Sequence, residues 1–598
     1  TLTFTGRDRY TTLRGTTPPQ HIDWKSDLDN SKKRAVKAAL GLDDVMVVTG
    51  PPGTGKTRFI AETVYQFLRF NPEAQILIVS QTHVAVDNAI ERLLSSGIED
   101  IVRIGGSDDV RISEQSRKLI LENRVTGWAK DIRQRSEQHF EKRAAQAGID
   151  KDHLRAVLIL EQFDARRRQI LEIERALKAT ESQGETASRL DLVDDPGELR
   201  RKLRSMREHQ RETLEAAHTL LDGGLALGDR PSQGDIRAAI DLLLNQDPAA
   251  RSLSSLLKLQ GEWLQRLEVD NAIASLYLQS SRVIAGTCLG FLRHRAVRDV
   301  QFDLCIIDEA SKATSTEALV PAVRSRRLVL VGDENQLPPV DEDLIRRRDL
   351  LENYDLNQDF VKQTLFSRLV EGLPDANRFA LDEQYRMIAP IGNLVSECFY
   401  EGNLKSPTAT GVRGYEHLGK TVCWIDTSSS PRRTEDRDTN YAGSYVNRYE
   451  ADLACQRLSS IDAALERGLV ESKDDGTPYE VLLISPYRGQ IDELKRRLNR
   501  QQLKNLSVEV ESVDAVQGRE ADFVVFSVTR SNEERRFGFL AHRYWRRINV
   551  ALSRARYGLT IVGDAAFSSD DRGALARVLT YIRQHPDECE IRSADVSN

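Results

Sequence analysis

Runs of apolar residues alternate with amphipathic stretches in two parts of the chain, and this alternation predicts most of its architecture. In the first part, residues 22–106, short apolar runs predict strands and amphipathic stretches predict helices. These elements are a helix over 30–40, strands over 45–49, 76–80 and 101–104, and helices over 58–69 and 84–95. Strands that alternate with helices favour a parallel sheet covered on both faces.

The alternation stops near Gly105 and Gly106, where a long charged segment begins. Residues 107–280 are poor in strand patterns, and two stretches, Leu154–Ser182 and Leu199–Leu221, carry apolar residues at helical spacing among many Arg, Lys and Glu. This pattern predicts a helical insertion shaped as an antiparallel hairpin, a coiled-coil arm. The pattern is equally typical of an insertion whose only role is to pack within the protein and of an arm that binds a protein partner.

The α/β pattern resumes at residue 281. Residues 281–375 are expected to complete the first domain, residues 376–598 to form a second α/β domain, and residues 1–21 to form an irregular N-terminal arm. The predicted strands are 282–286, 304–307, 327–331, 422–425, 480–484, 507–511, 523–528 and 559–562. The predicted fold class is therefore α/β, with two tandem domains on parallel sheets and a helical insertion in the first.

The composition of the chain restricts the kind of binding surface and the cellular compartment that we expect. Its 598 residues are 40% hydrophobic and 29% charged, with a net charge of −6, so a surface for nucleic acid must be local. The six cysteines form no C-x-x-C pair, which is typical of a reducing, cytoplasmic protein. No apolar run approaches the length of a membrane helix, and no secretory signal opens the chain. Because the chain begins at Thr1 rather than methionine, we expect a fragment or a processed chain.

The strand over 45–49 leads into a phosphate-binding loop. The loop fits G-x-x-x-x-G-K-[ST] and consists of Gly50, Pro51, Pro52, Gly53, Thr54, Gly55, Lys56 and Thr57. Glycines let the backbone approach phosphate oxygens, and amides at the start of the next helix donate to them. Lys56 supplies positive charge to the β- and γ-phosphates, and the Thr57 hydroxyl is a ligand for Mg²⁺.

Two later strands end in polar residues suited to the same chemistry. Asp308 and Glu309 follow the strand over 304–307, where parallel sheets bind ligands. We expect Asp308 to hold Mg²⁺ and Glu309 to orient and deprotonate the attacking water. Gln336, after the strand over 327–331, can hydrogen-bond both the γ-phosphate and that water.

The ordered set of segments resembles the superfamily 1 helicases, and within them the Upf1-like branch. The resemblance covers residues 28–106 and 281 to about 565, and its motifs are GPPGTGKT (50–57), SQTHVAVDNA (80–89), AGTCLG (285–290), DEAS (308–311), GDENQLPP (332–339), LDEQYRM (381–387), ISPYRGQ (484–490), VDAVQGREADFVVFSVTRS (513–531) and NVALSRAR (549–556). It implies two RecA-like domains that bind ATP and Mg²⁺ between them.

The resemblance also implies roles for residues of the second domain. Tyr385 is expected to stack on adenine, Glu520 to contact the ribose, and Arg386 and Arg554 to reach the γ-phosphate. Such cations stabilise the charge on a transferring phosphoryl group. Hydrolysis then requires the two domains to close.

Nucleic-acid contacts are implied by the same resemblance. The matching positions are Thr82, His83, Thr287 and Ser512, which are expected to bind the phosphates of a single strand of RNA or DNA.

One position departs from the family pattern. Lys32 stands where the Upf1-like proteins have a glutamine that reads adenine. Lysine has no hydrogen-bond acceptor, so other nucleoside triphosphates are expected to serve beside ATP.

Three functions remain open at this point. The favoured one is an ATP-dependent helicase that moves 5′-to-3′ along a single strand and unwinds duplexes. The second is an ATP-gated nucleic-acid clamp or remodelling subunit, which hydrolyses ATP without separating strands. A small-molecule phosphotransferase is disfavoured, because two arginines from a second domain suit domain-gated hydrolysis.

Overall fold

The structure of the chain is a computed structural model. It describes residues 19, 21–106, 109–147, 151–182, 196–220, 227–228, 231–246, 258–259, 271–294, 296–297, 300–339, 363–407, 410–569 and 573–594. The predicted N-terminal arm, 1–21, lies outside the described residues apart from 19 and 21. Contacts divide the chain into two units, Lys118–Ser280 and the remainder, Thr1–Arg117 with Ser281–Asn598.

The first lobe of the larger unit is built on a seven-stranded parallel sheet with the order β3-β4-β2-β5-β6-β1-β7. The strands are β1 (Val45–Thr49), β2 (Ile76–Ser80), β3 (Ile101–Arg103), β4 (Val283–Thr287), β5 (Leu304–Asp308), β6 (Leu328–Gly332) and β7 (Arg378–Ala380). All but β7 are buried almost throughout, as expected of a sheet covered on both faces.

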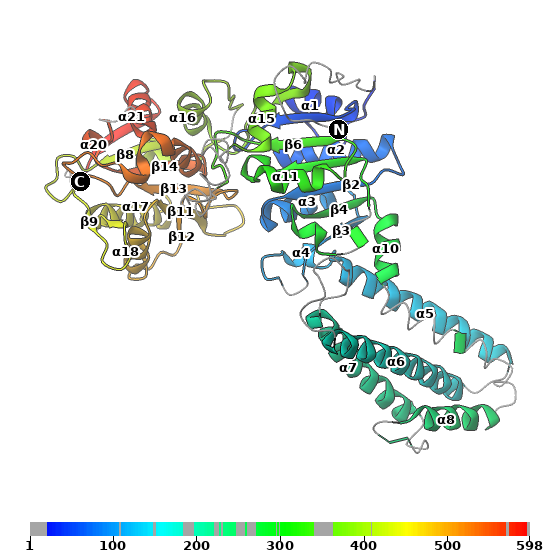
Figure 1. Cartoon of the computed structure of the whole chain (residues 1–598). Coiled ribbons are helices and arrows are strands. Elements are labelled where there is room, and N and C mark those ends of the chain that lie inside the picture. Colours follow the sequence, from blue (N-terminus) through cyan, green and yellow to red (C-terminus); the bar gives the residue numbers. More distant parts are fainter. Residues whose placement is uncertain are drawn as a thin grey trace. The chain divides into compact units, whose positions relative to one another are not determined.

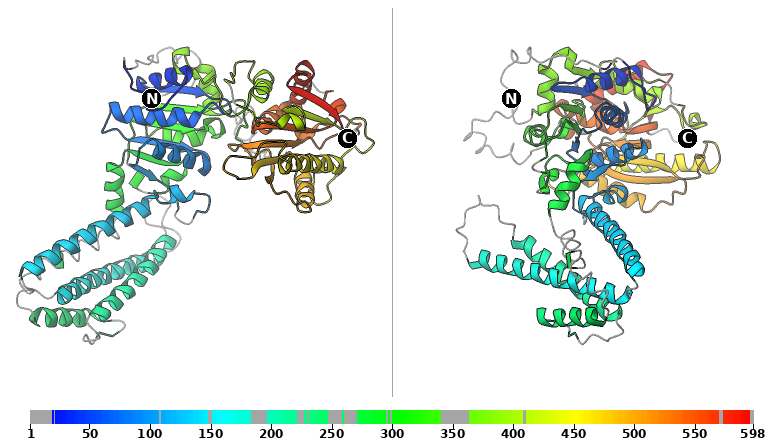
Figure 2. Two further views of the ribbon diagram at one scale, coloured as in Figure 1. Left: turned by 180° about the vertical axis from the view of Figure 1, so that it is seen from behind. Right: turned by 90° about the vertical axis from the view of Figure 1, so that its right-hand side faces the viewer.

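Helices cover both faces of this sheet. They are α1 (Asn30–Leu40), α2 (Lys56–Phe70), α3 (His83–Ser95), α11 (Ser315–Ala322) and α15 (Leu365–Gly372). Along the strand order, the connections through α2 and α3 run toward the β3 edge of the sheet, and those through α11 and α15 run toward the β7 edge. Because such crossovers are right-handed, the two pairs of helices lie on opposite faces. Figures 1 and 2 show the blue helices α2 and α3 and the green helices α11 and α15 on these two sides.

The second lobe repeats this arrangement on a six-stranded parallel sheet with the order β12-β11-β13-β14-β8-β15. The strands are β8 (Val422–Asp426), β11 (Tyr479–Ser485), β12 (Leu506–Ser512), β13 (Ala521–Ser527), β14 (Ala555–Gly563) and β15 (Cys589–Ser593). The helices are α16 (Ala389–Phe399), α17 (Arg448–Glu466), α18 (Arg488–Leu498), α19 (Trp545–Leu552), α20 (Ala565–Ser569) and α21 (Ala574–Gln584). One hydrophobic core includes residues of α17 and α18, and another includes residues of α16, α19 and α21.

Two parallel-sheet lobes confirm the predicted fold class. The first sheet extends beyond residue 375, the predicted end of the first domain, because β7 pairs in parallel with β1. This strand escaped prediction because it has only three residues, and Arg378 and Ala380 at its ends are exposed. A two-residue antiparallel pair, β9 (Asp436–Arg437) and β10 (Tyr445–Val446), was also not predicted.

The smaller unit is helical in its described residues. Its helices are α5 (Leu121–Ala147), α6 (Lys151–Ser182), α7 (Pro196–Leu220), α8 (Gln233–Gln246) and α10 (Asn271–Ser280). Helices α6 and α7 lie side by side and antiparallel, since Arg166 donates to Thr213 at 2.6 Å and Arg207 pairs with Glu174 at 2.5 Å (Figure 1). Residues of α6, α7 and α8 share one hydrophobic core. The outer boundaries of the predicted domains, and a partner for this unit, stay predictions.

None of the described helices combines the length and the apolar composition that a membrane crossing requires.

Candidate functional site: a nucleotide cavity in the larger unit

The phosphate loop joins β1 to α2 in the first lobe. Gly53 and Gly55 have φ values of 75° and 76°, a left-handed conformation that favours glycine. A Cβ atom on Gly53 would stand 2.6 Å from the Cβ of Arg386, so this position admits no side chain without rearrangement. The loop therefore has the close backbone curvature that phosphate binding requires, and its amides lead into the fifteen-residue helix α2.

Lys56 is the first residue of α2, and its side chain reaches back to the start of the loop. Its ammonium group donates to the Gly50 carbonyl oxygen at 3.0 Å and lies 3.8 Å from a carboxylate oxygen of Glu309. The predicted base and the predicted phosphate-binding cation are thus neighbours.

Asp308 and Glu309 stand at the carboxyl end of β5, as the sequence predicts. Glu309 has φ 50° and ψ 39°, an uncommon backbone conformation for a residue other than glycine, and such strain concentrates at functional sites. The Asp308 carboxylate accepts the Glu309 amide at 2.9 Å. The Oε2 atom of Glu309 is buried without a hydrogen-bond partner among the described residues, as expected of an acceptor reserved for a substrate water.

The two carboxyl groups differ in their protonation. Burial raises the pKa of Asp308 to about 7, and the negative charge of Glu309 adds to the effect. Burial also opposes the ionisation of Glu309, but the positive charges of Lys56 and Lys312 lower its pKa below the ordinary value. Glu309 is therefore ionised at neutral pH and can accept a proton.

Gln336 connects the loop after β6 to the second lobe. Its side-chain nitrogen donates to Asp333 at 2.8 Å, and its oxygen lies 3.4 Å from the amide nitrogen of Gln517. Asp333 also accepts the hydroxyl of Tyr400 at 2.8 Å. This buried network fixes the Gln336 amide at the wall of the cavity.

Two arginines reach the same cavity from different segments. Arg386 lies between β7 and α16, and Arg554 lies between α19 and β14. Arg386 donates to Glu520 at 2.6 Å, and the positive charge of Arg386 lowers the pKa of Glu520 against the effect of burial. Arg554 is 1% exposed, and its guanidinium donates to the carbonyls of Val550 and Arg519 at 2.9 and 3.0 Å. Burial, together with the nearby charge of Arg386, lowers the pKa of Arg554 to about 9.

These side chains line one cavity of about 710 Å³. The sequence-predicted residues on its wall are Pro51, Pro52, Gly53, Thr54, Gly55, Lys56, Thr57, Thr82, Asp308, Glu309, Gln336, Tyr385, Arg386, Glu520 and Arg554. The structure thus brings together almost the whole predicted nucleotide and metal site, with Gly50 at its edge through the bond to Lys56.

Thr57 and Asp308 fit a magnesium ion in this cavity. Both line the cavity and offer oxygen atoms. Mg²⁺ commonly binds through one or two protein oxygens together with substrate phosphates, so this sparse set suits it.

Ten further residues of the cavity wall were not predicted, and four of them bear most directly on the charge and hydrogen bonding of the site. These four are Lys312, Gln517, Arg519 and Arg556. Lys312 was detectable, because it lies four positions after Asp308, in the short 3₁₀ helix Ala310–Lys312 that starts at the strand end. Burial lowers its pKa, against the attraction of Glu309.

Lys32 lies beside Tyr385, the residue predicted to stack on adenine. Lys32 is buried and paired with Asp29, and its ammonium group lies 4.9 Å from the centroid of the Tyr385 ring. Tyr385 is 49% exposed, and its hydroxyl donates to Glu383 at 2.8 Å. An open ring beside a fixed cation is therefore available to a base.

The predicted nucleic-acid residues lie at the carboxyl ends of strands. Thr82 and His83 follow β2, Thr287 ends β4, and β2 and β4 are paired neighbours, whereas Ser512 ends β12 in the second lobe. Each of the three hydroxyl oxygens accepts a backbone amide three residues ahead, from Ala85, Gly290 and Ala515.

His83 is held by its neighbours. Its Nδ1 atom lies 3.2 Å from the Arg103 guanidinium and its Nε2 atom 3.6 Å from Asp109. Burial, and then the charge of Arg103, lower the pKa of the His83 imidazole.

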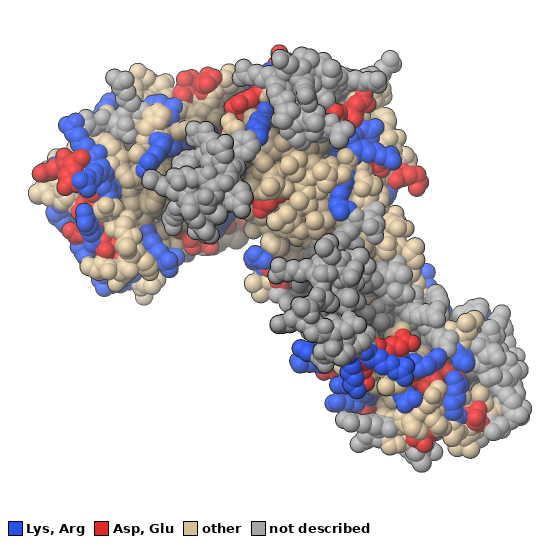
Figure 3. Space-filling model, in the orientation of Figure 1, with Lys and Arg blue, Asp and Glu red and all other residues tan. Residues whose placement is uncertain are grey.

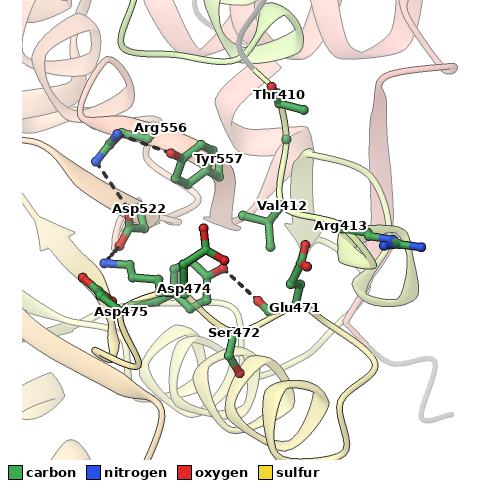
Figure 4. Close-up of a pocket in the computed structure, with 13 residues that line it drawn as sticks. Thr410, Val412, Arg413, Glu471, Ser472, Asp474, Asp475, Asp522, Arg556 and Tyr557 are labelled. Atoms are coloured by element: carbon green, nitrogen blue, oxygen red, sulfur yellow. Dashed lines mark hydrogen bonds and ion pairs between the residues drawn. The ribbon is translucent and has the colours of Figure 1, made fainter.

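A second cavity of about 450 Å³ lies in the second lobe (Figure 4). Its wall includes Glu471, Asp474, Asp475 and Asp522, and Asp522 pairs with Lys473 at 2.7 Å. The same wall also carries the cations Arg413, Lys473 and Arg556. The phosphate loop lines the other cavity, which is therefore the one that suits a nucleotide.

A phosphate loop, an adjacent carboxylate pair and two arginines on one cavity define a P-loop nucleoside triphosphatase. A family model described as an AAA domain matches residues 27–341, more than half of the chain, and a second model of the same description matches residues 361–566. The chain belongs to this family and, among the superfamily 1 helicases, to the Upf1-like branch.

Curated relatives agree with this assignment. DNA polymerase alpha-associated DNA helicase A of Schizosaccharomyces pombe is 26% identical over 554 residues, which are 91% of this chain and 64% of that protein. ATP-dependent helicase upf1 of the same organism is 32% identical over 323 residues, 52% of this chain and 32% of its own length. The Regulator of nonsense transcripts 1 homolog of Arabidopsis thaliana is 26% identical over 574 residues, 94% of this chain and 34% of its own. The chain thus spans between about a third and two thirds of these relatives.

Proposed function

We propose that the chain hydrolyses ATP and uses the energy to move 5′-to-3′ along single-stranded RNA or DNA and to unwind duplexes. The observation that carries this proposal is the single cavity shared by Lys56, Glu309 and the two arginines Arg386 and Arg554. Because the cations come from different lobes, closure of the lobes on the nucleotide completes the site. The relatives named as helicases support the same function.

The proposed chemistry begins with a water molecule at Glu309. Glu309 accepts a proton from this water as its oxygen attacks the γ-phosphorus, the bond to the oxygen that bridges the β- and γ-phosphorus atoms breaks, and ADP and phosphate leave. Lys56, Arg386 and Arg554 stabilise the charge on the transferring group, and Gln336 orients the water. Thr57 and Asp308 would hold Mg²⁺, which would supply positive charge to the phosphates.

Movement follows from alternating contacts with the strand. Thr82, His83 and Thr287 stand on the first lobe and Ser512 on the second, so a change in lobe separation shifts one set of contacts relative to the other. A cytoplasmic location is proposed because the six cysteines are unpaired and buried.

A strand-displacement assay tests this proposal. The purified chain should release the labelled strand of a duplex with a 5′ single-stranded tail when ATP and Mg²⁺ are present. A duplex with only a 3′ tail is the matched control for direction. ATP hydrolysis without release from either duplex would instead support an ATP-gated clamp.

A further inference from the structure

The segment between β13 and α19 leaves one of its aromatic side chains partly exposed. Phe537 stacks on Phe567 at 4.5 Å between ring centroids, and Leu540 is buried, so both neighbours anchor the segment to the second lobe. Phe539 lies between them and remains 37% exposed. The segment therefore holds this ring at the surface.

A tyrosine from another element fixes the ring in place. The hydroxyl of Tyr487, which follows β11, accepts the Phe539 amide at 3.1 Å, and the two rings lie 5.5 Å apart. Gly538 makes this approach possible, because its φ is 58° and a Cβ atom there would stand 2.4 Å from the Tyr487 hydroxyl. The backbone thus adopts a glycine-dependent turn that presents Phe539 outward.

One arginine lies against the exposed ring, and a second lies against the neighbouring ring of Tyr544. The Phe539 ring meets that of Tyr544 at 5.8 Å, edge to face. The guanidinium of Arg547 lies 4.9 Å from the Phe539 centroid and 5.1 Å from that of Tyr544, and Arg543 lies 4.8 Å from Tyr544. We call Phe539, Arg543, Tyr544 and Arg547 the aromatic face.

The aromatic face adjoins a predicted nucleic-acid contact. Arg547 lies 3.6 Å from the carboxylate of Asp514, which is two residues after Ser512. Tyr487, Ser512 and the start of the segment all lie at the carboxyl ends of neighbouring strands, β11, β12 and β13, where open α/β sheets bind ligands.

The overall charge of the chain favours a local surface, such as the aromatic face, as the site that binds nucleic acid. The net charge is −6, and on the face drawn in Figure 3 the blue and red side chains are interspersed over the described surface. Arg543 is exposed and forms no ion pair with the residues that the structure describes, so its charge is available to a phosphate. Aromatic rings with adjacent arginines match a single strand, whose bases offer flat faces and whose backbone is negative.

We propose that the aromatic face binds single-stranded nucleic acid, with a base stacked on Phe539 and a phosphate paired with Arg543. This inference rests on the proposed function and adds a stacking contact to its four polar contacts. A duplex hides the faces of its bases, so the contact selects single strands.

Fluorescence anisotropy of labelled oligo(dT), oligo(U) and a duplex tests the proposal on the full chain. Phe539→Ala should weaken binding of the single strands about tenfold, which is typical for the loss of one base stack, and should weaken duplex binding less. Both single strands are included because stacking tolerates either sugar. Phe70→Ala, at the exposed end of α2, is the matched control and should bind as the unchanged chain does.

Two further variants separate stacking from folding. Phe539→Tyr keeps the flat ring and should retain binding, whereas Phe539→Leu keeps an apolar contact with Tyr487 and should lose binding as Phe539→Ala does. Thermal melting establishes that each variant is folded. The proposal is overturned if folded Phe539→Ala and Phe539→Leu bind single strands as tightly as the unchanged chain, or if Phe539→Ala weakens duplex and single-strand binding equally. Failure of the unchanged chain to bind any of the three probes would instead contradict the proposed function.

Discussion

The side-chain amide of Gln517 donates to the side-chain oxygen of Gln336 across 3.4 Å. Gln336 follows β6 in the first lobe, and Gln517 lies between β12 and β13 in the second, five residues after the predicted nucleic-acid contact Ser512. The two amides therefore join the lobes at the wall of the nucleotide cavity, and we expect this contact to couple the cavity to the surface proposed to bind the strand.

Removal of this contact should uncouple the two sites. We expect Gln517→Ala to reduce the stimulation of ATP hydrolysis by single strands more than it reduces the basal rate, because the partner of Gln336 is lost. The measurement is steady-state hydrolysis with and without oligonucleotide for Gln336→Ala, Gln517→Ala and the double variant. If the two changes act additively, the contact carries no coupling.

Replacement of the predicted base should stop turnover but keep the nucleotide. Glu309→Gln preserves the shape of the side chain and removes its ability to accept a proton, so we expect kcat to fall by a factor on the order of 10²–10⁴. Lys56→Ala should lose both turnover and tight binding, because the phosphate charge is no longer compensated. Equilibrium binding of a fluorescent ATP analogue separates the two variants, and loss of binding by Glu309→Gln would argue against its role as the base.

The buried arginine should be irreplaceable by lysine. Arg554 donates in three directions, to Val550, Arg519 and Ser553, and an ammonium group cannot reproduce this fork. We expect Arg554→Lys and Arg554→Ala both to lower kcat by about 10³–10⁵. Arg583→Ala, on α21, is the control, and full activity of Arg554→Lys would contradict the assignment.

Lys32, beside the predicted adenine position, should reduce the preference for ATP over other nucleoside triphosphates. Lys32 is a hydrogen-bond donor only, so we expect GTP to be hydrolysed with a kcat/KM close to that for ATP. Lys32→Gln restores a donor and an acceptor and should raise the preference for ATP by about tenfold. Competition between ATP and GTP measures this preference. A strong ATP preference in the unchanged chain would refute this interpretation of Lys32.

A buried glutamate in the second lobe should make stability depend on pH. Burial raises the pKa of Glu450 to about 8, although its carboxylate accepts Ser527 and Thr529 at 2.7 and 2.6 Å. Since the folded state holds a proton that the unfolded state releases near its ordinary pKa of 4.5, Glu450 costs stability progressively as pH rises from that value to about 8. As pH rises over this range, the free energy of unfolding of Glu450→Gln should therefore increase relative to that of the unchanged chain. A difference that does not vary with pH would contradict the raised pKa.

The sequence predicted the strands that carry the nucleotide site because they are buried on both faces and read as continuous apolar runs. Strand β7 was missed because Arg378 and Ala380 are exposed, and its pairing with β1 depends on residues far away in sequence. The phosphate loop is recognised by its residue spacing, and Lys312 could have been found from its position four residues after Asp308. Gln517 reaches the cavity through a contact between the lobes, which no sequence pattern indicates. The aromatic face was missed for the same reason, since Tyr487 and Phe539 meet only in the fold.

The most direct test of the account is steady-state ATP hydrolysis with no nucleic acid, with single-stranded RNA and with single-stranded DNA, at low and high salt. We predict strong stimulation by at least one of the two polymers, reduced at high salt because phosphate contacts release counterions. Equal rates under all conditions would contradict a translocase driven by nucleic acid.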